Sequence, residues 1–306
     1  MEITILERDD GITHVVLAGR LDTTAAEELG PNISDAATGP DQPAIIDVSG
    51  IEFLASMGIG LLLANSKRLT KAGHKLVILN PQGMVDVVLK ASRLDKVMSI
   101  AYDLDEAIGI LQADQSPAGA PGPQGGVSTD ESRPEENSVS TVAPATENTL
   151  KLAIKNEISE FKTLNASLAE FLAAHAVPPR AAYTVDLAVE ELVMNVIRYA
   201  FVDDDTHSID IELEIEGDQI VFRIADDGRP FDPRENPVLD LQADDRQVGG
   251  LGLYLVVDMV DLLTYQRVDE ENRVEVRITM TAEDQAGELS EAVSDLSDAS
   301  GEYRGR

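Results

Sequence analysis

Two side chains one helical turn apart, Glu191 and Asn195, are the strongest chemical signal in the sequence. They lie in an apolar-periodic segment, 181–200, that predicts a helix. Residues four apart share a helix face, so the carboxylate and the amide can reach one ligand. A carboxylate that takes a proton, beside an amide oxygen that binds a hard cation, suits magnesium-dependent phosphoryl transfer. Alone, the pair is weak evidence, because such side chains are more often simply solvated.

Two further motifs follow in the chain. Asp226 and Gly228 come directly after an alternating apolar segment, 219–225, which predicts a strand. A carboxylate there can accept a hydrogen bond from an exocyclic amine such as that of adenine, and glycine lets the backbone approach a ring. An acidic turn capped by aspartate is the alternative. Gly250 and Gly252 then open an apolar helix predicted at 251–262, whose N-terminal amides could face an anion.

The order of these motifs resembles the ATPase superfamily of histidine kinases, gyrase and heat-shock ATPases (GHKL), and most closely its anti-sigma factor serine kinases. The resemblance covers residues 148–282, and it implies a C-terminal α/β sandwich. It is carried by the runs 190–201 and 226–233, the Gly-Gly-Leu-Gly-Leu turn, Met259-Val260-Asp261, Tyr265 and Asn272. A histidine kinase is disfavoured, because the only candidate phosphoacceptor, His175, sits at a predicted helix end before two prolines.

The resemblance also implies a role for each motif residue and for two cofactors, ATP and Mg²⁺. It makes Glu191 the catalytic base, Asn195 the Mg²⁺ ligand, Asp226 the adenine contact, and Gly228, Gly250 and Gly252 phosphate- and adenine-loop positions. It further implies a short mobile lid at 234–248 and a homodimer formed through this domain. The adjacent Glu190 is the alternative base, but one residue along a helix is rotated by about 100°.

Residues 1–112 resemble the anti-sigma factor antagonist family, or STAS domains, in residues 18–23 and 46–60. That resemblance implies a mixed sheet with helices and a phosphoacceptor hydroxyl at a helix N-terminus. Here Ala55 replaces the family's Asp, Ser56 supplies the first hydroxyl, and Met57 occupies the usual acceptor position. Methionine cannot accept a phosphoryl group, so we expect it to offer an apolar contact instead. Ser56 is expected to cap the helix, with phosphorylation of Ser56 as the alternative.

The elements that must position these residues fall into two patterns. In the first segment, a hairpin, two buried strands and helical periods predict an open α/β domain. In the second, helices and strands are partly segregated, which predicts an α+β arrangement. The predicted elements are strands at 3–6, 15–18, 44–48 and 76–79 with helices at 58–72, 83–90 and 104–111, then helices at 151–175, 181–200 and 251–262 with strands at 208–216, 219–225, 262–267 and 273–281.

The remaining segments lack the apolar residues needed to form a core. Residues 113–147 are rich in Pro, Gly, Ser and Thr and are expected to be a disordered linker, and 283–306 a disordered acidic tail. A flexible linker of about 35 residues reaches roughly 30–35 Å, so the two domains, 1–112 and 148–282, could dock within one chain.

Composition narrows the choice of partners. Asp and Glu number 56 against 24 Lys and Arg, giving a net charge of -32, so nucleic acid and anionic membranes are poor partners. Cys is absent, which excludes thiolate chemistry and fits a reducing compartment. With no apolar run of membrane-spanning length and no signal sequence at the N-terminus, we expect a cytoplasmic protein.

Together these features predict an ATP-binding regulator of a partner-switching system. The first hypothesis is a serine protein kinase that acts on a separate antagonist (STAS) protein, with its own STAS domain as a regulatory decoy. The second is a non-enzymatic, ATP-dependent module that sequesters a sigma factor or similar regulator. The third is an ATP sensor whose first domain serves as a scaffold. The intact Glu191 favours the first, because a pure binding module needs no base.

Overall fold

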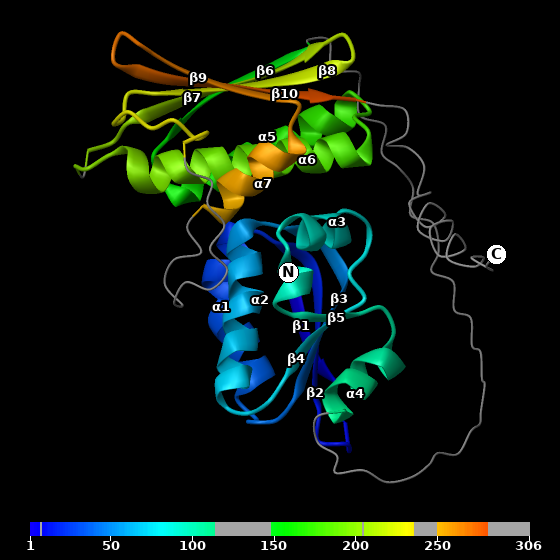
Figure 1. Cartoon of the computed structure of the whole chain (residues 1–306). Coiled ribbons are helices and arrows are strands. Elements are labelled where there is room, and N and C mark those ends of the chain that lie inside the picture. Colours follow the sequence, from blue (N-terminus) through cyan, green and yellow to red (C-terminus); the bar gives the residue numbers. More distant parts are fainter. Residues whose placement is uncertain (7, 114–147, 204, 236–249, 281–306) are drawn as a thin grey trace, which may run out of the picture.

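The computed structural model describes residues 1–6, 8–113, 148–203, 205–235 and 250–280. These residues form two five-stranded sheets, one in each half of the chain. Figure 1 shows the helices of the second half lying between their own sheet and the first domain. The predicted combination of an α/β and an α+β unit is therefore confirmed. The predicted linker and tail lie outside the described residues.

The first sheet is mixed, with strand order β1-β2-β3-β4-β5. β1 pairs antiparallel with β2, as the hairpin pattern predicts, and the other neighbours are parallel. The strands are β1 (Glu2–Leu6), β2 (Thr13–Leu21), β3 (Ala44–Leu54), β4 (Leu76–Leu79) and β5 (Ser99–Ala101). The helices are α1 (Thr23–Thr38), α2 (Ser56–Lys71), α3 (Gly83–Ala91) and α4 (Leu104–Gln112), with a 3₁₀ turn, η1 (Leu94–Lys96).

Helix α1 was not predicted from the sequence, because Gly30 and Pro31 interrupt its pattern. Its N-terminus nevertheless carries a clear signal, since the Asp22 side chain accepts a hydrogen bond from the amide of Ala25 at 2.8 Å. Ile33 is fully buried against the sheet and anchors the helix beyond the proline. Tertiary packing therefore overrides the local helix-breaking signal.

The second sheet has the order β6-β7-β8-β10-β9, and every neighbouring pair is antiparallel. Its strands are β6 (Thr149–Lys155), β7 (Ser208–Glu216), β8 (Gln219–Asp226), β9 (Leu262–Val268) and β10 (Glu271–Thr279). Its helices are α5 (Ile158–Ala174), α6 (Pro179–Asn195) and α7 (Leu251–Met259), with a π-helical turn, η2 (Val196–Ala200), continuing α6.

The prediction of a single helix over 151–175 was wrong at its start. Residues Thr149–Lys155 form β6, which pairs with β7, and α5 begins only at Ile158. Leu150, Leu152 and Ile154 alternate with exposed Lys151 and Ala153, a period of two that a helix cannot use. The signal for a strand was thus present in the sequence.

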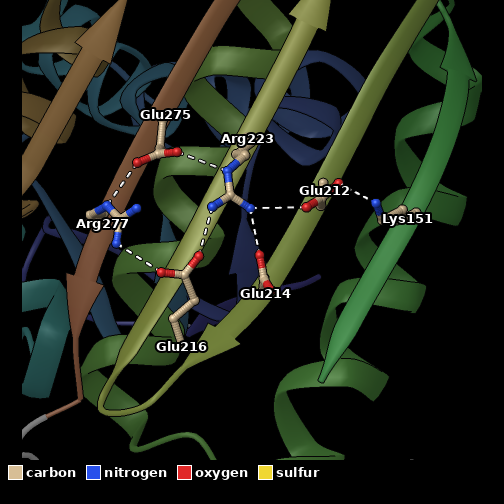
Figure 2. A network of polar contacts seen from close by, with 7 residues as sticks. All are labelled: Lys151, Glu212, Glu214, Glu216, Arg223, Glu275 and Arg277. Atoms are coloured by element: carbon tan, nitrogen blue, oxygen red, sulfur yellow. Dashed lines mark hydrogen bonds and ion pairs between the residues drawn. The ribbon is translucent and has the colours of Figure 1, made fainter. Parts of the chain in front are cut away.

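Ion pairs connect neighbouring strands on the outer face of the second sheet. Arg223 on β8 lies among carboxylates from β7 and β10, with nitrogen-to-oxygen distances of 2.8–3.0 Å. Figure 2 shows this network, which consists of Arg223 with Glu212, Glu214, Glu216 and Glu275, joined by Arg277 and Lys151. One guanidinium therefore offsets the repulsion of four acidic side chains on one sheet face.

This network makes the stability of the second sheet depend on pH. Hydrogen bonds from Lys151 and Arg223 lower the pKa of Glu212 and Glu216. Burial alone would raise the pKa of Glu275, but its bonds to Arg223 and Arg277 bring it below the ordinary value. A carboxylate whose pKa is lowered in the folded protein stabilises the fold at pH values above its pKa in the unfolded chain. This stabilisation is lost as the pH falls through its pKa in the folded protein.

We therefore expect Arg223→Met to lower the free energy of unfolding at pH 7 by about 1 kcal/mol, because the pairs are partly exposed. The difference from the unmodified chain should shrink below about pH 4, where the carboxylates are protonated. Urea unfolding at the two pH values measures both effects. Arg273→Met is the matched control, since Arg273 bonds to Glu271 on its own strand. An equal loss at both pH values would contradict the electrostatic account.

Candidate active site

Two adjacent glutamates of α6 contact the N-termini of two helices in the first domain. Oε1 of Glu190 accepts a hydrogen bond from the amide of Thr23, the first residue of α1, at 2.5 Å. Oε1 of Glu191 accepts one from the amide of Ser56, the first residue of α2, at 2.8 Å. First-turn amides have no partner within their own helix, and the helix dipole favours a negative charge there.

The Ser56 side chain makes a second bond to the same glutamate. Its hydroxyl donates to Oε2 of Glu191 at 2.7 Å, so both carboxylate oxygens of Glu191 are bonded to Ser56. Burial raises the pKa of Glu191, while the two bonds from Ser56 act in the opposite direction. A hydroxyl hydrogen-bonded to a buried carboxylate is the arrangement of a nucleophile and its general base.

Gly252, in the first turn of α7, lies against this site. A Cβ on Gly252 would lie 1.8 Å from Oε2 of Glu191 and 3.0 Å from the hydroxyl oxygen of Ser56, so a side chain there would displace the Glu191 carboxylate. Gly250, with φ of 96°, adopts the left-handed conformation that starts the helix. The amide end of α7 therefore adjoins both Glu191 and Ser56.

Asn195 lies on the same helix as Glu191, as predicted, but the two side chains contact different groups. The side-chain nitrogen of Asn195, Nδ2, donates to the backbone carbonyl of Glu191 at 2.6 Å, whereas the Glu191 carboxylate bonds to Ser56. The Asn195 oxygen is the atom suited to a cation. The π-helical turn η2 follows directly, and such turns are frequent at functional sites.

Asp226 and Gly228 form a second cluster, at the end of β8. Oδ1 of buried Asp226 accepts bonds from the amide of Gly228 and from the side-chain nitrogen of Asn272, both at 2.9 Å. Burial raises the pKa of Asp226, and the bond from Asn272 opposes this shift. A Cβ on Gly228 would lie 2.6 Å from the Cβ of Ala200. Gly228 is thus required by packing against η2.

Asn272 is more central to this cluster than its sequence signal suggested. Its Oδ1 accepts bonds from the hydroxyl of Tyr265 at 2.9 Å and from Arg267 at 2.7 Å, while its nitrogen holds Asp226. Tyr265 and Asn272 entered the sequence analysis only through the family resemblance. Asn272 pairs with Arg267 across β9 and β10, and its bonds to Tyr265 and Arg267 fix the side chain that donates to Asp226.

The contact between the domains extends beyond the two glutamates. Arg20 of β2 donates to Asp186 of α6 at 2.6 Å and lies 4.0 Å from the centre of the Phe53 ring. The Phe53 ring packs against Tyr183, whose hydroxyl bonds to the backbone of Leu54 at 3.2 Å. Sequence reasoning missed this contact, because Arg20 and Tyr183 gain their partners in the other domain only when the two domains dock.

Apolar residues of the second domain complete this contact. Side chains from α6 and α7 belong to the same buried cluster as the core of the first domain: Tyr183, Leu187, Leu251 and Leu255. Figure 1 shows α7 at the junction, where it lies against α2 and α3. The expected docking of the two domains within one chain is therefore present in the structure.

The expected role of Ser56 as the cap of the helix was wrong. Ala55 is the N-cap of α2, and Ser56 is the first helical residue and makes no capping bond, since its hydroxyl donates to Glu191 instead. Met57 is 37% exposed, and its expected apolar contact stays a prediction. Of the predicted lid at 234–248, only Arg234 and Glu235 are described, and Gly249 also lies outside the described residues.

Comparison with known proteins assigns both halves of the chain. Residues 4–107 match the STAS domain, and residues 154–279 match the histidine kinase-like ATPase domain. The serine/threonine-protein kinase BtrW of Bordetella bronchiseptica is 32% identical over 97 residues, which are 31% of this chain and 68% of BtrW. The chain therefore belongs to this family of ATPase-domain serine protein kinases, with a STAS domain at its N-terminus.

Other relatives match smaller parts. The serine-protein kinase RsbW of Listeria monocytogenes is 31% identical over 81 residues, which are 24% of this chain, and the match spans about half of RsbW, 52%. An anti-sigma factor antagonist from Mycobacterium paratuberculosis is 27% identical, with a TM-score of 0.33, covering 36% of this chain and 95% of that structure. Within the described part of the chain, no helix has the length and apolarity to span a membrane.

The docked contact should weaken as pH rises. Burial raises the pKa of Glu190 to about 8, with Asp22 and Glu191 adding to the shift, and its Oε2 is buried without a partner. A carboxyl group whose pKa is raised on docking stabilises the docked state at low pH. The full stabilisation is present at pH values below the ordinary pKa of 4.5, and it is lost as the pH rises through about 8. We expect the docking equilibrium to fall at least about tenfold between pH 6 and 9.

Energy transfer between two dyes measures this change. Because the chain has no Cys, labelled cysteines can replace one exposed residue in each domain, Asp105 and Glu170. Glu190→Gln, which cannot ionise, should show a clearly smaller pH response. If its pH response equals that of the unmodified chain, Glu190 does not control the docking.

Proposed function

We propose that the chain is an ATP-dependent protein serine kinase of a partner-switching system, regulated by its own STAS domain. The observation that carries this proposal is the bond of 2.7 Å between the Ser56 hydroxyl of the STAS domain and Glu191 of the ATPase domain. A serine of one domain thus meets the buried carboxylate of the other, where a glycine turn adjoins both.

Glu191 is the general base in this proposal. Its Oε2 accepts the proton of a serine hydroxyl that lies within hydrogen-bonding distance. Burial raises its pKa, which makes the carboxylate a better proton acceptor than an exposed glutamate. The amide of Ser56 holds Oε1, so the other oxygen faces the hydroxyl.

The remaining residues fit a magnesium-bound nucleotide. Magnesium-bound ATP would supply the phosphoryl group and spread its negative charge. The described residues contain no cluster of three or more His, Asp or Glu able to hold a metal. Asn195 would therefore provide a protein oxygen for Mg²⁺, with phosphates and water as the other ligands, which is typical of Mg²⁺ sites.

Asp226 would bind the adenine base. Gly228 and Asn272 both bond to its Oδ1, so Oδ2 is the oxygen that would accept a hydrogen bond from the exocyclic amine. Gly250 and Gly252 start α7 beside Glu191 and would bind phosphate oxygens through backbone amides. The two clusters would thus hold the two ends of one nucleotide.

The surface that binds the chain's own STAS domain would also bind a separate antagonist protein with the same fold. Such a protein would present a serine at the N-terminus of the equivalent helix, and it would have to displace the attached domain. A sigma factor is the other expected partner, and a homodimer through the ATPase domain stays a prediction. The non-enzymatic alternative draws on Glu191, whose two oxygens already serve as a docking contact.

Kinase activity is tested with labelled ATP, Mg²⁺ and a separate antagonist protein. Glu191→Gln should retain most nucleotide affinity while phosphoryl transfer falls by about 10²-fold or more, because the amide cannot take the proton. Asn195→Ala and Asp226→Asn should instead weaken nucleotide binding by about tenfold, the loss expected from one charged or cation contact. Calorimetry measures binding, and label incorporation measures transfer.

Two neighbours provide matched controls for these variants. Glu190→Gln changes the adjacent glutamate, which contacts Thr23, and Asp227→Asn changes the carboxylate next to Asp226. At pH 6, where the Glu190 carboxyl is protonated and resembles the amide of Gln, both should keep transfer within a few-fold of the unmodified chain. Unchanged transfer in Glu191→Gln would remove Glu191 from the role of base and favour the binding module.

A further inference from the structure

Three side chains of α6 contact backbone atoms of the first domain. The Tyr183 hydroxyl bonds to both the amide and the carbonyl of Leu54 at 3.2 Å. Glu190 and Glu191 accept bonds from the first amides of α1 and α2. Every domain with this fold offers such backbone groups, whatever its side chains are. These contacts can therefore recognise the STAS fold, but they do not distinguish one STAS domain from another.

Two ion pairs across the same contact depend on the side chains of both domains. Nη1 of Arg20, in β2, donates to Oδ2 of Asp186, in α6, at 2.6 Å. Arg198, in η2, bonds to Glu27, in α1. The two pairs have opposite polarity, since the second domain presents a carboxylate in one pair and a guanidinium in the other.

We infer that these two ion pairs decide which STAS domain the second domain binds. A separate antagonist protein fits when it carries a basic side chain at the position of Arg20 and an acidic one at the position of Glu27. The part of this inference that concerns separate antagonists rests on the proposed function, in which the same surface binds them.

The surroundings of Arg20 make its ion pair the stronger of the two. Its guanidinium lies 4.0 Å from the centre of the Phe53 ring, and the Asp186 side chain is only 17% exposed. Burial disfavours the charge on Arg20, but the bond from Asp186 and the nearby charge of Asp22 hold its pKa above the ordinary value. Water and salt screen a partly buried pair much less than an exposed one. Glu27 is 41% exposed, so its pair with Arg198 contributes less.

A carboxylate at the position of Arg20 would be repelled. It would face Asp186 and lie beside Asp22, both of which attract the guanidinium in this structure. Burial already raises the pKa of Asp186, and the bond from Arg20 opposes that shift, so Asp186 would also lose its hydrogen-bond donor. Contacts between like charges and unpaired buried charges are means by which an interface rejects wrong partners.

Charge reversal in the full chain tests the pairing, with the dye pair at Asp105 and Glu170 reporting the docking equilibrium. Arg20→Glu and Asp186→Arg should each weaken docking at least about tenfold. The double variant should return to within about threefold of the unmodified chain, because the pair is formed again with opposite polarity. Such a recovery also excludes misfolding as the cause of the single losses. Single variants that dock normally, or a double variant as weak as the single ones, would overturn the inference.

The matched control applies the same charge changes away from the contact. Arg68 is exposed in the last turn of α2, and Asp210 is exposed on β7, in the sheet that the helices separate from the first domain. Arg68→Glu combined with Asp210→Arg should leave docking within about twofold of the unmodified chain, as expected for distant surface sites.

Mixing the two singly reversed full chains tests selection between separate molecules. The first domain of Arg20→Glu complements the second domain of Asp186→Arg, and the remaining two domains still carry the natural pair. With one dye at Asp105 of the first variant and the other at Glu170 of the second, energy transfer between chains should appear on mixing. It should be much weaker when both dyes are carried by separate copies of one variant. Equal energy transfer in the three samples would contradict selection by charge.

These docking measurements need no nucleotide, so they distinguish failure of this inference from failure of the proposed function. If charge reversal behaves as expected but no antagonist protein is phosphorylated, the pairing stands and the proposed kinase activity is wrong. If the chain phosphorylates antagonist proteins equally fast with either charge at the position of Arg20, the proposed function stands and the inference is wrong.

Discussion

The contact between the two domains depends on a pair of consecutive carboxylates, each of which accepts hydrogen bonds at the start of a helix. Glu190 bonds to the first residue of α1 and Glu191 to the first residue of α2. Adjacent residues on α6 can do this because α1 and α2 begin side by side at one end of the first domain. Burying two acidic groups is costly, and the first-turn amides offset that cost.

Three arginines of this acidic chain lie where carboxylates would otherwise repel one another. Arg223 joins the acidic side chains on the outer face of the second sheet, as Figure 2 shows. Arg20 and Arg198 pair with Asp186 and Glu27 across the domain contact. Both domains can therefore be strongly acidic and still dock, because the repulsion is cancelled locally rather than by net charge.

In the proposed kinase, the attached STAS domain would compete with a separate antagonist protein for the same surface. A surface that recognises the helix N-terminus of a separate antagonist would also recognise that of the attached domain, and the attached domain has the advantage of high local concentration. Ser56 lies where a substrate serine would lie, bonded to Glu191. Regulation and catalysis would thus share one carboxylate, and events that weaken its bond to Ser56 would free the site.

The sequence by itself determined the two domain types, most strands and helices, and the three motifs around Glu191, Asp226 and Gly252. The strands and helices follow from local periodicity, which a single sequence displays directly, whereas the domain types and the combined meaning of the motifs came from resemblance to known families. β6 shows the same period of two and could have been recognised. Only the tertiary structure decided which hydroxyl meets the base. Ser56 and Glu191 are far apart in sequence, and their contact depends on how two independently patterned surfaces pack, which no local pattern encodes.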